Sequence, residues 1–188
     1  HIRPEARFVN GDPVLAADVK YSYDMLMSKA ASPGYRSMCT DVKAVMVTGE
    51  RSIRFDFKQR NAELPLIVGQ LPVFSKKWTA KVPFEKLTFE DPITSGPYKI
   101  ERYDAGRGIV FQRDPNYWGK NLNVRRGTFN FNRVVYRLYK DETAKLEAFK
   151  AGEFDAIVEY RSKNWAKSYV GTKFRDGSLI KTEDRKST

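Results

Sequence analysis

Residues 131–160 switch twice between strand-like and helix-like spacing of apolar side chains. Residues 131–139 predict a strand, and Asp141 is an N-cap candidate for a helix that ends at Gly152. The apolar stretch 154–160 predicts a second strand. A strand–helix–strand unit with short connections favours a mixed α/β fold that contains a parallel pair of strands.

Four other segments carry clear local signals. The turn residues 10–13 (Asn-Gly-Asp-Pro) precede a predicted helix at 16–29, and residues 42–58 alternate as a hairpin does. A short helix is expected at 61–68 and a second hairpin at 98–111. The spacing of apolar residues changes near Thr94, where we place the boundary between two parts of the chain.

Composition limits the kinds of chemistry available. With one cysteine (Cys39) and one histidine (His1), the chain cannot assemble a zinc site or a histidine-based hydrolase triad. It contains no phosphate-binding glycine loop. The acidic pairs Glu90-Asp91 and Asp141-Glu142 are adjacent in sequence only, and Asp141 already has a capping role. We therefore expect a protein that is not an enzyme and needs no cofactor or metal.

The chain is strongly basic, with a formal net charge of +11. The cations are distributed along the chain, which favours a solvated surface or a field that attracts acidic ligands. A basic nucleic-acid-binding module is the alternative from another functional class. No apolar run is long enough to span a membrane, and the N-terminal residues lack the apolar core of an export signal.

One segment has the composition of a ligand site. The predicted strand at 154–160 is followed by polar and aromatic residues, and ligands of α/β sheets bind beyond the carboxyl ends of strands. Glu159 could pair with a ligand amine, and Arg161 could hold a carboxylate with its planar fork. The candidate ligand-binding residues are Glu159, Tyr160, Arg161, Asn164 and Trp165.

The same residues have a purely structural interpretation. Glu159 and Arg161 would then be solvated surface charges, and Trp165 would belong to the core. The sequence leaves both interpretations open, because a concave site cannot be recognised from sequence alone.

Four motifs in order resemble the family 5 extracellular solute-binding proteins of ABC importers. They are Phe8–Val19 (Phe-Val-Asn-Gly-Asp-Pro-Val-Leu-Ala-Ala-Asp-Val), Gly96-Pro97-Tyr98, Asn116-Tyr117-Trp118-Gly119 and Ala151-Gly152-Glu153-Phe154-Asp155. Asn10 stands where the family more often has Asp. The stretches 124–131 and 146–150 are similar to the oligopeptide-binding branch that contains YejA.

The resemblance implies an exported periplasmic protein with two lobes around a cleft, whose signal peptide lies outside this chain. Residues 1–94 would form part of the subdomain inserted in the first lobe, and residues 95–188 a central portion of that lobe. This chain would be an incomplete fragment that ends near the crossover into the second lobe. By position in the family, Tyr160 and Arg161 would face the cleft, with Glu159, Asn164 and Trp165 nearby.

The expected partners are an oligopeptide ligand and the membrane permease of an ABC importer, with the binding protein itself monomeric and not membrane-spanning. We expect no nucleic acid as a partner. Within the same family, the cargo could instead be a metal chelate, a sugar or a peptide-like antibiotic.

Overall fold

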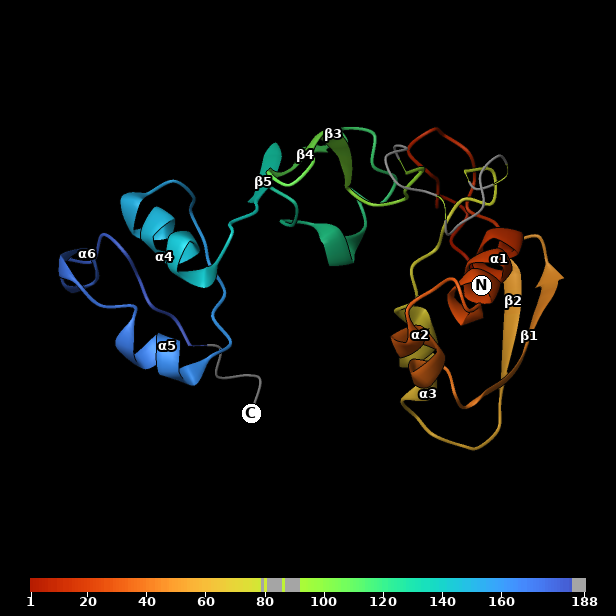
Figure 1. Cartoon of the computed structure of the whole chain (residues 1–188). Helices are drawn as coiled ribbons and strands as arrows, with labels where there is room; N and C mark the ends of the chain where they lie inside the picture. Colours follow the sequence, from red (N-terminus) through yellow and green to blue (C-terminus); the bar gives the residue numbers. More distant parts are fainter. Residues whose placement is uncertain (79, 81–85, 87–91, 184–188) are drawn as a thin grey trace. The chain divides into compact units, whose positions relative to one another are not determined.

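The computed structural model describes residues 1–78, 80, 86 and 92–183, and it consists of two compact units, His1–Tyr136 and Arg137–Thr188 (Figure 1). The acidic pair Glu90-Asp91 lies outside the described residues. Helices and sheets both occur, which confirms the mixed α/β class. No helix in the described part of the chain combines the length and apolarity that crossing a bilayer requires.

In the first unit, helix α1 (Ala16–Met27) is followed by α2 (Pro33–Met38) and α3 (Leu64–Gly69). The expected helix at 16–29 is confirmed, and its start is fixed by Asp18, whose carboxylate accepts a hydrogen bond from the Leu15 N–H at 3.0 Å. An acidic group in the first turn also complements the helix dipole. The short α2 was not predicted.

Strands β1 (Val42–Gly49) and β2 (Ser52–Phe57) form the expected hairpin, pairing antiparallel with Val45 opposite Phe55. Helix α1 packs on this hairpin, as Figure 1 shows, and the Tyr23 and Phe55 rings meet edge to face at 6.0 Å. The apolar face of α1 therefore packs against a hairpin that lies within about the next thirty residues of the chain, so these contacts have a low sequence separation.

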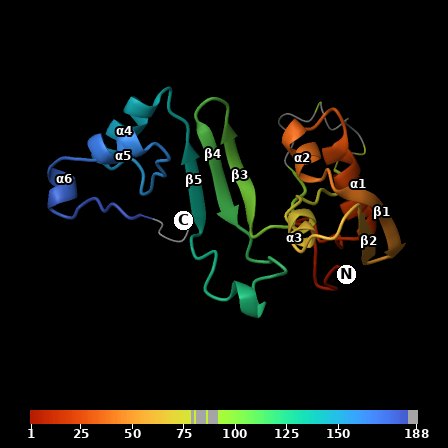
Figure 2. The ribbon, with the colours of Figure 1, turned by 90° about the horizontal axis from the view of Figure 1, so that it is seen from below.

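A second sheet has the order β3–β4–β5, with β3 (Tyr98–Asp104), β4 (Gly108–Arg113) and β5 (Arg133–Arg137) side by side in Figure 2. The hairpin expected at 98–111 is confirmed, with Ile100 opposite Phe111. The strand expected at 131–139 is present but shorter.

The second unit contains α4 (Glu142–Ala151), α5 (Ser162–Lys167) and α6 (Thr172–Arg175). Both predicted ends of α4 are confirmed. The Asp141 side chain accepts a hydrogen bond from the Ala144 N–H at 2.8 Å. Gly152 takes φ 87°, a left-handed conformation that glycine adopts without steric cost.

The strand predicted at 154–160 is wrong, and so is the parallel pair that depended on it. Within the part of the chain that the structure describes, no backbone hydrogen bond joins residues 155–160 to any other segment. The physical reason is that a strand forms only where its backbone N–H and C=O groups can bond to a neighbouring strand. The apolar pattern of a sequence predicts which side chains would be buried, but it does not show whether such a neighbour exists.

Candidate functional site

The sequence-predicted site residues lie in the second unit, where Glu159 connects two of the others, Arg161 and Asn164, with the neighbouring Tyr169. Its Oε1 accepts the Arg161 backbone N–H at 2.8 Å. Its Oε2 accepts Asn164 Nδ2 at 3.1 Å and the Tyr169 hydroxyl at 3.4 Å. The backbone hydrogen bond from Arg161 contributes most to lowering the pKa of Glu159 below its ordinary value. The charged carboxylate thus fixes the turn that leads into α5.

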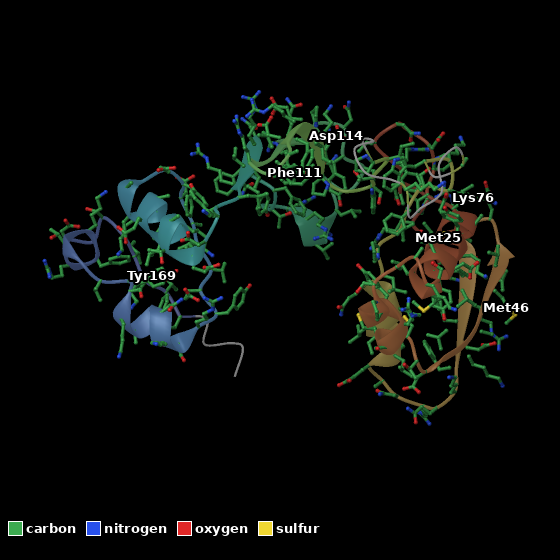
Figure 3. The ribbon with its side chains drawn as sticks, viewed as in Figure 1. Met25, Met46, Lys76, Phe111, Asp114 and Tyr169 are labelled. Carbon is green, nitrogen blue, oxygen red and sulfur yellow. The ribbon has the colours of Figure 1, made fainter. Side chains whose placement is uncertain are left out.

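Tyr169 is a member of this cluster that the sequence did not single out as a site residue. Only 4 % of the residue is exposed, and Figure 3 shows it among the helices of the second unit. Its ring contacts Trp165 and Phe174 at centroid distances of 5.9 and 6.2 Å. Burial, followed by the charge of Glu159, raises the pKa of Tyr169 to about 12. The four-residue spacing from Trp165 was the available signal, since such pairs share a helix face.

Trp165 is held on two sides by its own unit. The ring contacts Tyr169, and Lys181 Nζ lies 4.4 Å from the ring centroid while also donating to the Trp165 carbonyl at 2.7 Å. A cation over an indole face in this range is attractive. The structure therefore gives Trp165 a packing role, and contact with a ligand stays a prediction.

Tyr160 and Arg161 differ from the other predicted residues in how open they are. Tyr160 is 91 % exposed. The Arg161 guanidinium forms no salt bridge or hydrogen bond with any residue that the structure describes, although its backbone N–H is bound to Glu159. The unpaired backbone of residues 155–160 thus ends in an exposed phenol, that of Tyr160, and is followed directly by the available guanidinium of Arg161.

The first unit contains a separate hollow of about 800 Å³, which sequence reasoning missed. Its walls come from two stretches that are distant in sequence, 4–11 and 114–118, together with Gly96. The Trp118 indole is fixed there by a 2.9 Å hydrogen bond to the Ser95 carbonyl. Among the described residues, no group of three or more His, Cys, Asp or Glu side chains is arranged to hold a metal ion.

Comparison with known proteins identifies the class. Residues 1–186 match the family described as bacterial extracellular solute-binding proteins, family 5, middle region. The chain is 35% identical to the uncharacterized protein YejA of Escherichia coli, and 34% identical to a probable peptide-binding protein YejA of Agrobacterium fabrum. These alignments cover 98% and 97% of this chain, but only 30% and 31% of the relatives. The chain therefore spans about a third of the length of the curated relatives it matches.

Solved structures show a similar fold. The chain is similar to AgaA of Agrobacterium tumefaciens, a periplasmic binding protein in complex with agropinic acid (TM-score 0.68, 20% identity, 88% of this chain and 35% of that one). It is equally similar to OppA of Burkholderia pseudomallei (TM-score 0.68, 20% identity, 81% and 32% covered). Fold and relatives together define a solute-binding protein. The chain belongs to the bacterial extracellular solute-binding proteins, family 5, and the expected resemblance to the YejA branch is confirmed.

Proposed function

We propose that this chain is part of the periplasmic substrate-binding component of an ABC importer, and that the component binds oligopeptides. The name of the relative from A. fabrum, a probable peptide-binding protein, supports a peptide cargo. We further propose that residues 1–94 belong to an inserted subdomain and residues 95–188 to a central portion of the first lobe. The short coverage of the relatives supports a chain that is one portion of a longer protein.

The observation that carries the peptide proposal is the unpaired backbone at 155–160, which ends in the exposed Tyr160 and is followed by Arg161. A peptide in extended conformation can bind such a segment by adding a strand, since its own N–H and C=O groups match those of the protein. Tyr160 would offer a broad apolar face to a ligand side chain, and Arg161 would bind a carboxylate with two parallel hydrogen bonds.

Glu159 would act differently from these two residues. Its two oxygens already accept hydrogen bonds from Arg161, Asn164 and Tyr169. We propose that Glu159 positions Tyr160 and Arg161, and that it contacts a ligand amine only through lone pairs that those bonds leave open. Asn164 and Trp165 would support the segment from α5.

Titration calorimetry with a defined peptide mixture tests the proposal. In a polypeptide of the relatives' full length, we expect binding, and we expect Arg161→Ala to weaken it about tenfold to a hundredfold through loss of a charge-assisted pair. Lys163→Ala removes a neighbouring exposed charge and should leave the affinity unchanged. Residues 1–188 alone should bind peptide weakly or not at all. Unchanged peptide affinity of the Arg161→Ala protein would contradict the assigned role.

A different cargo is the second candidate, because solved relatives of similar fold hold chemically varied ligands. One is described in complex with mannohexaose and another with Fe(III)-EDTA. The same titration with a sugar oligomer and with a ferric chelate distinguishes these cargoes. Tight binding of either, with no response to peptides, would replace the oligopeptide proposal while retaining the solute-binding class.

A further inference from the structure

The stretch between Asp114 and Asp141 contains no acidic residue. Six cations occur in it, and the first three, Lys120, Arg125 and Arg126, lie in one loop between β4 and β5. We call residues 120–131 the cationic loop. An interval of this length without a carboxylate is notable in a chain with 23 Asp and Glu residues, and it concentrates positive charge locally.

The cationic loop has a defined conformation. It contains the 3₁₀ turn η2 (Asn123–Arg125), after which the Thr128 N–H donates to the Arg125 carbonyl at 3.1 Å. Asn130 Nδ2 donates to the Gly127 carbonyl at 2.9 Å. Phe129 takes φ 57°, a conformation uncommon for a residue with a side chain. These bonds hold the loop in one shape, so its exposed groups are preorganised.

The loop cations lack acidic partners. Arg125 lies over the Phe129 ring at 5.5 Å, and Lys120 Nζ donates to the Pro115 carbonyl at 2.8 Å. Arg113, at the base of the loop, donates to Asn132 Oδ1 at 2.6 Å. Among the residues that the structure describes, no carboxylate forms a salt bridge with these three side chains or with Arg126. By contrast, Arg133 just beyond the loop is paired with Glu101 at 2.7 Å.

The same loop exposes two large apolar side chains. Val124 and Phe131 are each 74 % exposed, more than most other large apolar residues of the chain. Val124 stands directly beside Arg125, and the Phe129 ring beneath that arginine is partly buried. Single exposed apolar residues are ordinary, but here two of them coincide with unpaired cations on one preformed loop.

We propose that the cationic loop is a docking surface for an anionic phospholipid bilayer. Arg125, Arg126 and Lys120 would meet the lipid phosphates, and Val124 and Phe131 would enter the acyl boundary. Interfacial binding combines these two contributions, apolar insertion and attraction to anionic lipid. A nucleic acid offers phosphates and an aromatic stack, but an aliphatic side chain such as Val124 has no flat face on which a base can stack.

Vesicle cosedimentation with residues 1–188 tests the proposal. Binding should occur with vesicles that contain phosphatidylglycerol, be absent with phosphatidylcholine alone, and weaken as salt is added. The double variant Arg125→Ala/Arg126→Ala should lower the partition coefficient about thirtyfold, as expected for the loss of two interfacial cations. The double variant Lys29→Ala/Arg60→Ala removes two exposed cations elsewhere and has the same net charge, so it is the matched control.

A third variant separates insertion from net charge. Val124→Ser/Phe131→Ser leaves the charge unchanged and should also weaken vesicle binding, while circular dichroism verifies that the fold is retained. Equal losses in the two charge variants would overturn the proposal, because net charge alone would then explain binding. Wild-type vesicle binding by the Val124→Ser/Phe131→Ser protein would overturn it too. Tighter binding to a single-stranded oligonucleotide than to vesicles, lost with Arg125 and Arg126, would assign the loop to nucleic acid instead.

Discussion

The region built from α1 and the β1–β2 hairpin differs from the second unit in where its partners lie. In the first, α1 packs on a hairpin that follows it closely in sequence, and Leu26 is 2 % exposed. In the second, the backbone of residues 155–160 has no hydrogen-bonded partner among the described residues, and Val158 is 66 % exposed. The difference shows that an apolar sequence pattern forms a helix or strand where a packing partner is close in sequence. Where none of the described residues supplies a partner, the same kind of pattern leaves an unpaired segment.

The largest expected effect tests the packed region. Leu26→Ala should reduce the free energy of unfolding by about 2–5 kcal/mol, because it leaves a cavity in a filled interior. The measurement is urea-induced unfolding, with an unchanged slope confirming that the denatured state is comparable. Leu66→Ala is the control, since Leu66 is 67 % exposed and should cost less than about 0.5 kcal/mol. Equal losses at the two positions would remove the distinction between packed and open sites.

A buried hydrogen bond in the same region should matter less. Ser22 is 1 % exposed, and its hydroxyl donates to the Asp18 carbonyl at 2.7 Å and accepts the Phe74 N–H at 2.7 Å. Ser22→Ala removes that acceptor and should cost about 1–3 kcal/mol in thermal or urea unfolding. Ser37→Ala, at an exposed serine of α2, is the matched control and should be close to neutral.

The second unit is tested at the start of α4. Asp141→Ala removes the cap that accepts the Ala144 N–H, and should cost about 1 kcal/mol of helix stability. Hydrogen exchange at the first turn of α4 reports this loss directly. Asp155→Ala, an exposed carboxylate in the open segment, should leave the exchange pattern of α4 unchanged. A larger effect at Asp155 would mean that the open segment is ordered by side-chain contacts that its backbone does not show.

A dependence on pH is expected at Tyr169, and it has no effect at neutral pH. Its pKa is raised to about 12, whereas an unfolded tyrosine ionises near pH 10. The contribution of Tyr169 to stability is therefore complete below pH 10, and is lost as the pH rises from about 10 to about 12. Ultraviolet titration of the wild type minus Tyr169→Phe isolates this one phenol. Replacement Glu159→Gln should lower the pKa of Tyr169, and a pKa near 10 in the wild type would contradict the burial of this ring.

The sequence predicted those elements whose determinants are local. The Asp141 cap, the Gly152 terminus and the alternation in β1 and β2 each depend on residues a few positions apart, and each is confirmed. The strand at 154–160 depended on a distant partner, and that prediction was wrong. For the candidate site, the sequence singled out Glu159 but not its bond with Tyr169, because a pairing across ten residues arises from tertiary packing, here the burial of Tyr169 between Trp165 and Phe174.

The unpaired segment at 155–160 also determines where the chain is cut most easily. A protease binds its substrate without internal backbone bonds, and among the described residues the backbone of 155–160 forms none, while the Arg161 carbonyl accepts only the Trp165 N–H of the first turn of α5 at 3.0 Å. Trypsin cleaves after arginine, so the peptide bond following Arg161, at the end of the unpaired segment, becomes an early site when the first turn of α5 frays. Cleavage there would separate Glu159 from Asn164 and Tyr169. The rate of that single cut, measured with and without a ligand, would show whether the ligand forms backbone hydrogen bonds with residues 155–160.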